Sequence, residues 1–403
     1  MYKTDRIINL VYSRTFSSHL LAACRRNHPR HPTGLTRDTC DPCFAEVERL
    51  FQSYLDSGEE LGASFAVNID GANVIDLWGG HADSTSKAIT ALAALICVER
   101  GLLDLDERVA TYWPEFATAG KQDILVRHVL SHTSGVSGWD AVLSLEETID
   151  LPYSTALLAA QPAWSAPPGT RIYYQAFNHG HLVGELVRRT TGKSLRRFVA
   201  EEIAAPLGTA DFQLGADEKD WHRVADVVPP PPLPAGTGAA PPDSIAAKTF
   251  RSPPLDATRA NSDVWRRADL SAANGHANAR GVARVLSAVA LGGGAVDGVT
   301  LLSEKTIARI FEEQARGVDL ALGAPMRIRI GYGLAGKETM AGWLPDDERV
   351  CYWGGWGGSA GIMDVGRHMA VGYVMNKMEN ALFGNERIKV LVTAVYRALG
   401  VEV

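Results

Sequence analysis

The sequence lacks the features that a membrane-spanning or nucleic-acid-binding protein would need. No apolar stretch in its 403 residues approaches the roughly 20 residues that a membrane-spanning helix requires. An excess of positive charge is also missing, since the formal net charge is −6. Hydrophobic residues make up 46% of the chain, which is ordinary for a globular protein. We therefore expect a globular chain with a large core, no nucleic-acid partner and no membrane span.

Cysteine is scarce, with five residues in the whole chain. Their number is odd, and Cys97 lies in an apolar run where a reduced thiol is expected. Cys40 and Cys43 form a C-x-x-C, but no second Cys or His pair stands nearby to complete a zinc site. The pattern predicts no disulfide framework, no metal and a reducing compartment, which we take to be the cytoplasm.

Acidic residues are nearly absent from residues 1–40, where Asp5 and Asp38 face seven Lys or Arg residues. The apolar run Ile7–Tyr12 is too short for the core of a secretory signal. A basic, serine-containing, acid-poor leader is typical of a mitochondrial presequence. The alternative is a disordered extension or an inaccurately assigned start of the gene. Both interpretations separate this leader from a folded domain over residues 41–403.

Within the folded part, hydrophobic periodicity predicts an α/β (α+β) architecture. A helix over 41–58 and a hairpin at Asp70-Gly71 are mirrored near the C-terminus by two strands around Gly366 and a final helix. Since neighbouring strands tend to pair, the two chain ends are expected to meet in one antiparallel sheet flanked by helices. The prediction is a sheet lobe at about 41–83 and 321–403, and a mostly helical inserted lobe at about 84–320. Within that insert, the Pro-rich segment 227–243 predicts an exposed loop.

A serine and a lysine open an almost wholly apolar helix at the start of the inserted lobe. Ser84 stands three positions before Lys87, and the run ends at Gly101. Ser84 has an ordinary interpretation as a helix cap. Lys87 has none, because a cation is disfavoured at a helix N-terminus and a buried ammonium needs a partner or must lose its proton. Residues one turn apart share a face, so the pair also fits a nucleophile and its amine base. Of the ten lysines, only Lys87 has a serine three positions before it.

Several further segments, in this order, resemble one known family. They are "ERGLLDLDERVATYWPEF", "VRHVLSHTSGVSG", "PPGTRIYYQAFNHGHLVGELVRRTTGKS", "SAANGHANARGVARVLSAVALGG" and "CYWGGWGGSAG". Together with the S-x-x-K they resemble the serine β-lactamase and penicillin-binding-protein superfamily, in its class C-like branch. That branch includes carboxylesterases and the fungal lovastatin-type acyltransferases. The resemblance runs from about residue 41 to the C-terminus and implies a β-lactamase/transpeptidase-like fold.

The resemblance also assigns roles to individual residues. It implies that Ser84 is the nucleophile, Lys87 its base, and Tyr174 a second group that shares the acid/base work. Trp353-Gly354-Gly355 stands where lactamases have K-T-G. The Trp356 N–H that follows would complete an oxyanion hole with the N–H of Ser84. No cofactor is implied.

Two departures from the lactamase pattern favour ester chemistry. The lactamase Y-x-N is Tyr174-Gln175-Ala176 here, and the lysine of K-T-G is missing. We therefore predict a serine hydrolase or esterase that acts on a small ester or thioester through an acyl-Ser84 intermediate. The alternatives are an acyltransferase of secondary metabolism, a β-lactamase, or a non-catalytic relative.

A competing nucleophile is Ser359, within the G-x-S-x-G of Gly357–Gly361. The nucleophile elbow of α/β-hydrolases needs a strand–turn–helix, whereas a strand pattern follows here. Ser359 is therefore expected beside the oxyanion site. The histidines at 128, 132, 179, 181 and 276 lack metal-ligand spacing and are interpreted as capping or packing residues, with His276 a candidate for the cleft wall.

The connection before the nucleophile is short. Only three residues separate Gly80 from Ser84, and four residue steps reach at most roughly 14 Å. Ser84 can reach a cleft only if the preceding strand ends beside it. Otherwise the strand gives up residues, or the gene sequence has lost a segment. This shortening is the basis of the non-catalytic alternative.

Overall fold

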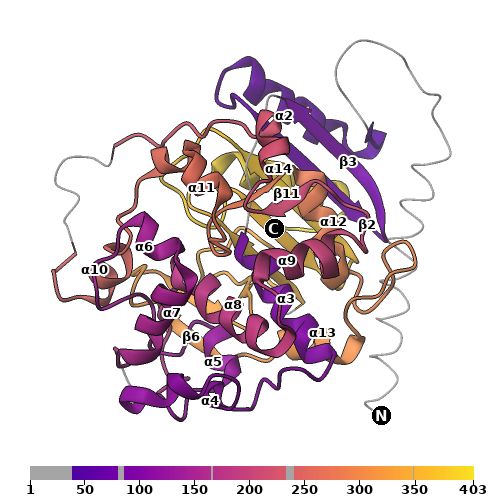
Figure 1. Ribbon diagram of the computed structural model, residues 1–403. Helices are drawn as coiled ribbons and strands as arrows, with labels where there is room; N and C mark the ends of the chain where they lie inside the picture. Colours follow the sequence, from indigo (N-terminus) through magenta and orange to yellow (C-terminus); the bar gives the residue numbers. More distant parts are fainter. Residues whose placement is uncertain (1–38, 80–85, 165–166, 233–239, 348) are drawn as a thin grey trace, which may run out of the picture.

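The computed structural model describes residues 39–79, 86–164, 167–232, 240–347 and 349–403. Its main sheet has nine strands in the order β1-β3-β2-β11-β10-β9-β8-β7-β6, and all neighbouring pairs are antiparallel (Figure 1). The strands are β1 Thr39–Cys40, β2 Ala63–Ile69, β3 Ala72–Gly79, β6 Ala315–Val318, β7 Pro325–Ile328, β8 Gly333–Leu334, β9 Val350–Gly354, β10 Ala360–Asp364 and β11 Met369–Met375.

The two ends of the folded chain meet at the middle of this sheet. β2 pairs with β11 along its whole length, with Phe65 opposite Tyr373 and Val67 opposite Val371. The β2–β3 and β10–β11 hairpins lie where Asp70-Gly71 and Gly366 predict them. The predicted α/β fold, with one antiparallel sheet built from both chain ends, is confirmed.

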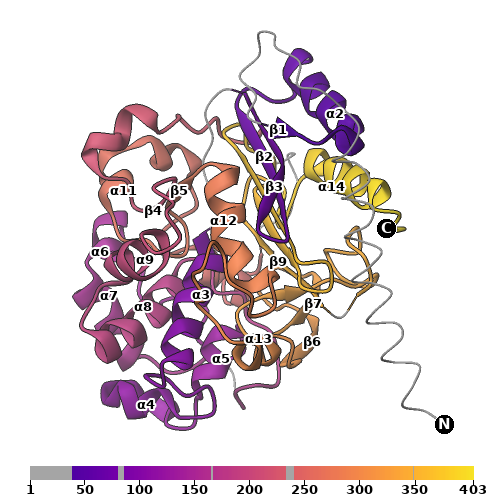
Figure 2. The same cartoon turned by 90° about the vertical axis from the view of Figure 1, so that its right-hand side faces the viewer.

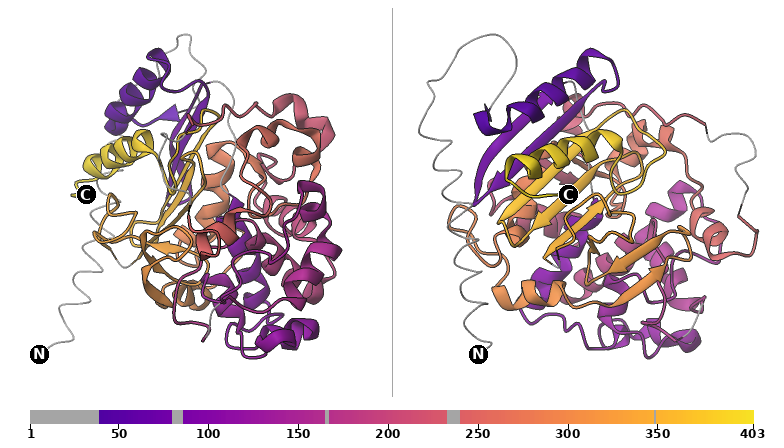
Figure 3. Two further views of the ribbon diagram at one scale, coloured as in Figure 1. Left: turned by 90° about the vertical axis from the view of Figure 1, so that its left-hand side faces the viewer. Right: turned by 180° about the vertical axis from the view of Figure 1, so that it is seen from behind.

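Helices cover both faces of the sheet. On one face the helices α2 (Ala45–Asp56) and α14 (Glu386–Ala398) pack against each other, as Figures 2 and 3 show. On the other face α12 (Ala279–Ala290) lies against β2, β10 and β11. The approach of α12 is close at Gly372, where a Cβ atom would lie 2.5 Å from the Ala279 carbonyl oxygen. Only glycine fits this contact between helix and sheet.

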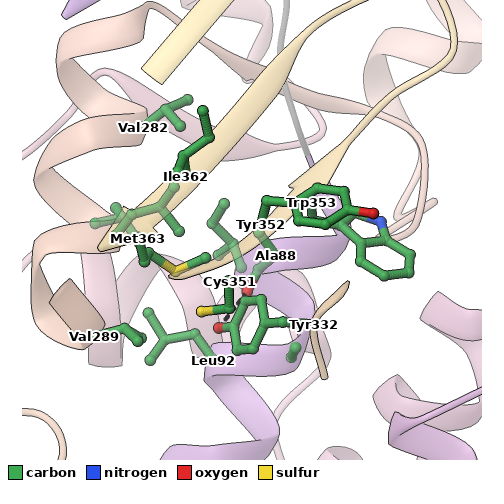
Figure 4. Close-up of a cluster of buried hydrophobic side chains, with 14 of the residues drawn as sticks. Ala88, Leu92, Val282, Val289, Tyr332, Cys351, Tyr352, Trp353, Ile362 and Met363 are labelled. Carbon is green, nitrogen blue, oxygen red and sulfur yellow. Dashed lines mark hydrogen bonds between the residues drawn. The ribbon is translucent and has the colours of Figure 1, made fainter. Parts of the chain in front are cut away.

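The buried helix predicted after Ser84 is α3, Ser86–Glu99. Every residue from Ser86 to Cys97 is buried, because α3 lies between the sheet and the helices α8 (Asn178–Thr191) and α9 (Leu195–Val199). In Figure 4, Ala88 and Leu92 of α3 face Tyr332 and Cys351. The Tyr332 hydroxyl donates to the Ala88 carbonyl at 3.0 Å, which fixes the first turn of α3 against the sheet lobe.

The inserted region is mostly short helices, but it also contains a small sheet that the sequence pattern misses. Three-residue strands at Phe212–Leu214 (β4) and Gly275–Ala277 (β5) pair with each other. Strands this short show no readable alternation. The remaining α-helices are α4 Val109–Tyr112, α5 Val126–Leu130, α6 Leu145–Ile149, α7 Leu151–Ala160, α10 Ile245–Phe250, α11 Asp263–Arg267 and α13 Glu304–Ile310.

The two lobes are interleaved more closely than the predicted boundaries suggest. β6 joins the main sheet ahead of residue 321, and α12 covers that sheet from within the inserted segment. In the Pro-rich segment, the described residues 228–232 and 240–243 are mostly exposed, and Val227 is buried. None of the helices in the described ranges is long and apolar enough to cross a membrane.

Candidate active site

Lys87 lies in the first turn of α3 and is almost completely buried. Its Nζ donates to the Ala272 carbonyl oxygen at 2.8 Å and lies 5.2 Å from the centre of the Tyr174 ring. Burial lowers the pKa of the Lys87 amine to about 7. A substantial fraction of this lysine is therefore a neutral amine at neutral pH. Ser84, the predicted nucleophile, falls outside the described residues.

Three side chains attach the start of α3 to one segment of the inserted lobe. The Ser86 hydroxyl accepts from the Gly275 N–H at 2.7 Å. The Thr90 hydroxyl donates to the Ser271 carbonyl at 2.5 Å. Together with the bond from Lys87 to Ala272, these contacts hold the first turn of α3, and the Lys87 amine on it, against residues 271–275.

Tyr174 lies four residues before the start of α8, and its ring is surrounded by other rings. The nearest are His132 at 5.6 Å, Phe383 at 6.2 Å and Trp353 at 6.3 Å between centroids. Burial, followed by the nearby Asp319 carboxylate, raises the pKa of the Tyr174 phenol well above its ordinary value. The phenol therefore stays protonated at neutral pH and can donate a proton or a hydrogen bond.

Asp319, which is distant from Tyr174 in the sequence, fixes the backbone of Tyr174. One carboxylate oxygen accepts from the Tyr174 N–H at 2.7 Å, and the other accepts from the N–H groups of Ala321 and Leu322 at 2.8 and 2.7 Å. Burial raises the pKa of Asp319 to about 6 against these three bonds. The carboxylate thus joins the Tyr174 segment to the turn between β6 and β7.

Asp319→Ala is expected to lower the free energy of unfolding by about 3 kcal/mol or more, because three buried N–H groups lose their acceptor. Asp319→Asn keeps one oxygen for Ala321 and Leu322 and should lose less. Since burial raises the folded-state pKa of Asp319, the pH-dependent part of its contribution is fully present below about pH 4 and is lost as the pH rises through about 6, whereas the three hydrogen bonds remain. Urea unfolding across this range measures both effects. Equal stability of the two variants would contradict the role given to the second oxygen.

Two buried imidazoles, those of His132 and His179, lie close to Lys87 and Tyr174. The His132 ring stacks between His179, at 4.6 Å, and Trp353, at 5.0 Å. Gln175 holds both rings: its backbone N–H donates to His132 Nδ1 at 3.1 Å, and its side-chain oxygen lies 2.9 Å from His179 Nδ1. Burial, with the nearby Lys87, lowers the pKa of His132 and takes that of His179 to about 3. Both rings are neutral near pH 7, so they add no positive charge beside the amine.

A glycine turn after β9 carries the predicted oxyanion donor. The N–H groups of Gly355, Gly357 and Gly358 donate to the carbonyls of Ser359, Ala381 and Gly355. Within the described part of the chain, no backbone carbonyl accepts from the Trp356 N–H. The turn is tight: a Cβ on Gly354 would lie 2.5 Å from Phe383 Cα. With respect to the residues that the structure describes, the Trp356 N–H is therefore available to a ligand.

The structure brings most of the predicted site residues to one cavity of about 400 Å³. This volume suits a small organic ligand. The cavity is lined by Lys87, Tyr174, Gly354, Gly355, Trp356 and Ser359. Most of the remaining wall is hydrocarbon, including Phe177, Phe250, Leu255, Trp265, Met375 and Leu382. The substrate of such a cavity is expected to be largely apolar.

Other predicted residues lie elsewhere. The Trp353 side chain is buried in the ring stack and does not line the cavity, whereas its backbone leads into the glycine turn. His276 lines a separate, more polar cavity with Asp76 and Arg223. Ser359 lines the same cavity as Lys87 and Tyr174, but the strand β10 follows it, so the nucleophile elbow of α/β-hydrolases is not formed.

The residues that hold the site together have no signature in the sequence. Gln175 stands out only as a departure from Y-x-N. Asp319 and Ala272 give no signal, since each acts through a contact with a residue more than 100 positions away. The C-x-x-C pair forms no metal site in the described ranges, where no three His, Cys, Asp or Glu side chains cluster in metal-binding geometry.

The chain is similar to known esterases over most of its length. The crystal structure of a family VIII carboxylesterase superposes with a TM-score of 0.82 at 34% identity, covering 90% of this chain and 99% of that one. Esterase/beta-lactamase LipL of Mycobacterium tuberculosis is 31% identical over 382 residues, which span 85% of this chain and 83% of LipL. Monacolin J acid methylbutanoyltransferase of Aspergillus terreus is 33% identical over 154 residues, 32% of this chain and 36% of that enzyme.

The family model named Beta-lactamase matches residues 47–394, which include the Lys87 amine, the Tyr174 phenol and the glycine turn at Trp356. Since this match covers most of the chain and the relatives named above extend over most of its length, the chain belongs to the Beta-lactamase family.

Proposed function

We propose that this protein is a serine esterase that hydrolyses small, largely apolar esters or thioesters through an acyl-enzyme on Ser84. The observation that carries the proposal is the meeting of a buried amine of lowered pKa, a protonated phenol and a free backbone N–H in one apolar cavity. The names of the relatives, a carboxylesterase and an esterase/beta-lactamase, support the same chemistry.

The proton steps follow from the pKa directions. The neutral Lys87 amine takes the proton of the Ser84 hydroxyl as its oxygen attacks the ester carbonyl. The protonated Tyr174 phenol, 5.2 Å from Lys87 Nζ at its ring centre, lies where it can donate toward the leaving alcohol. The Lys87 ammonium then returns its proton to the Tyr174 phenolate, which restores the starting state of both groups. Water attacks the acyl-serine and gives a proton to the Lys87 amine, while the Tyr174 phenol protonates the departing Ser84 oxygen. A second transfer from the ammonium to the phenolate completes the cycle.

The developing negative charge of the tetrahedral intermediate needs donors that are already in position. The Trp356 N–H supplies one, and the Ser84 N–H would supply the second. A tight turn fixes the Trp356 amide, so little reorganisation accompanies the reaction.

The expected substrate is neutral at the glycine turn, because this chain has Trp353 where lactamases have the lysine of K-T-G. A β-lactam carboxylate would find no matching cation from that position. Turnover of the chromogenic β-lactam nitrocefin is therefore expected to be slower than hydrolysis of p-nitrophenyl butyrate.

The test is intact-mass measurement of the full chain after exposure to p-nitrophenyl butyrate, with release of p-nitrophenol followed in parallel. One butyryl group per chain and catalytic release are expected, and heat-unfolded protein is the control. Folded protein, verified by circular dichroism, that forms no adduct with any activated ester would favour the non-catalytic alternative.

Acyl transfer is the second candidate, supported by the similarity of 154 residues to monacolin J acid methylbutanoyltransferase. It uses the same acyl-enzyme, with an alcohol in place of water. Product analysis with a thioester donor, with and without candidate acceptor alcohols, separates the two. Ester product formed faster than free acid would favour transfer.

A further inference from the structure

Part of the cavity wall is a segment whose one regular element is an isolated β-bridge between Val228 and Lys377. Residues 226–231, here called the 226–231 strap, run past the end of β11. Val227 is the strap residue that lines the cavity, and it is 9% exposed, whereas its neighbour Val228 is 38% exposed. The three prolines that end the strap have no N–H, so the strap cannot hold itself in place by a strand ladder.

Asn261, at the end of the short helix η5 (Ala257–Asn261), fixes both backbone groups of Val227. Its side-chain oxygen accepts from the Val227 N–H at 2.7 Å, and its side-chain nitrogen donates to the Val227 carbonyl at 3.0 Å. An amide of this kind imitates a neighbouring strand for a single residue. Ala257 and Ala260 of the same helix line the cavity, so Asn261 joins two parts of its wall.

Further contacts attach the rest of the strap to cavity-lining segments. The Val228 N–H donates to the Asn376 carbonyl, and the Val228 carbonyl accepts from the Met378 N–H, at 2.8 and 3.0 Å. Asn380 donates to the Pro231 carbonyl at 2.7 Å. At the other end of the strap, the Asp226 carboxylate accepts from the Arg266 guanidinium at 2.7 Å. Arg266 directly follows Trp265, which lines the cavity.

This attachment brings the strap close to the reacting centre. Met378 pairs with the strap through its backbone, and its side chain lies against Gly357, where a Cβ would meet Met378 Cγ at 2.9 Å. Gly357 directly follows Trp356, the proposed oxyanion donor. The cavity wall beside the glycine turn therefore includes Met378, and the strap that carries Val227 is bonded to this residue.

We propose that Val227 is a specificity-determining residue that limits the length of the apolar group of the substrate, and that Asn261 is the positioning residue that holds it. The inference rests on the proposed esterase function. The hydrocarbon group is either the acyl chain or the alcohol of the ester, which share the same chemistry.

Two ester series on the full-length protein separate these sources. One varies the acyl chain with p-nitrophenol fixed, and the other varies the alcohol with the acetyl group fixed. Val227→Ala is expected to raise the ratio of kcat/KM for a C8 over a C4 group by about tenfold in one series, the discrimination that a few methyl groups supply in an apolar pocket. Val228→Ala, on the exposed neighbour, is the matched control and should leave the ratio unchanged.

Asn261→Leu keeps the size of the side chain and removes both hydrogen bonds to Val227. It should shift the C8/C4 ratio in the same direction as Val227→Ala while kcat for the acetate ester stays close to wild type. Asn261→Asp still accepts from the Val227 N–H, so its C8/C4 ratio should lie between those of wild type and Asn261→Leu. A fall in activity on all esters alike, with no change in ratio, would mean that Asn261 is merely structural and would overturn the proposal. A shift of equal size in Val228→Ala would overturn it as well.

A binding readout keeps the result independent of turnover. Linear alcohols from butanol to decanol can be titrated while the intrinsic tryptophan fluorescence is followed, since two of the nine tryptophans, Trp265 and Trp356, line the cavity. Tighter binding of the longer alcohols by Val227→Ala than by wild type supports the limit on length, even if no ester is hydrolysed and the esterase function fails. Identical profiles of the two proteins would overturn the limit.

Discussion

Ser84→Ala is expected to abolish acyl-enzyme formation and to lower ester hydrolysis by on the order of 10⁴-fold or more, because no other group supplies the attacking oxygen. The matched variant is Ser359→Ala, which removes the second serine hydroxyl of the same cavity. Ser359→Ala should still be labelled by a fluorophosphonate and should keep most of its ester hydrolysis. The measurement is fluorophosphonate labelling followed by peptide mass mapping, together with p-nitrophenol release.

The two variants distinguish which serine is the nucleophile, because each assignment predicts loss of labelling in a different variant. Labelling that persists in Ser84→Ala and disappears in Ser359→Ala would reverse the assignment. Loss in both would indicate that the Ser359 hydroxyl, which lies against Gly355, orients the glycine turn. Thermal unfolding of both variants at wild-type temperature is the control for folding.

Lys87→Met is expected to lower kcat/KM for esters by on the order of 10³-fold, the typical effect of losing a general base. Wild-type kcat/KM should rise with pH through a midpoint near the pKa of about 7 that burial gives the amine, because only the neutral form accepts a proton. Lys87→Arg should be equally inactive over the same range, since guanidinium keeps its proton.

The surroundings of Lys87 make this pH profile specific. Burial lowers the pKa of His132 and of His179, and raises that of Tyr174. None of these three groups is thus expected to titrate near pH 7. A midpoint near 7 that survives in the residual activity of Lys87→Met would assign the titration to another group and contradict the role of this amine as base. Slow fluorophosphonate labelling should remain in the variant, since the Ser84 hydroxyl is still present.

The sequence predicts the outline of the fold because its signals are local and periodic. The Asp70-Gly71 and Gly366 hairpins, the buried helix α3 and the final helix are all marked by alternation or by helical spacing, and the structure has each of them. The pairing of β2 with β11 followed from topology alone. The short strands β4 and β5 gave no such pattern.

For the site, the sequence indicates the groups that react and not those that hold them. Lys87 stood out because a lysine conflicts with a buried helix, and the structure reports the expected burial and lowered pKa. Asp319 and Asn261 could not be found this way, because their partners Tyr174 and Val227 are distant in sequence and the contacts are made to backbone atoms. The roles of Ser84 and of the Trp356 N–H remain predictions for the experiments above.

The central pairing of β2 with β11 has a consequence for how the chain is made. The two strands are about 300 residues apart, so a growing polypeptide presents one edge of the β2–β3 hairpin without its partner for most of its synthesis. That edge, rich in Val, Ile and Phe, can pair with other nascent chains in the meantime. We expect expression at low temperature or with a holdase chaperone to decide whether recombinant material is recovered folded or as inclusion bodies.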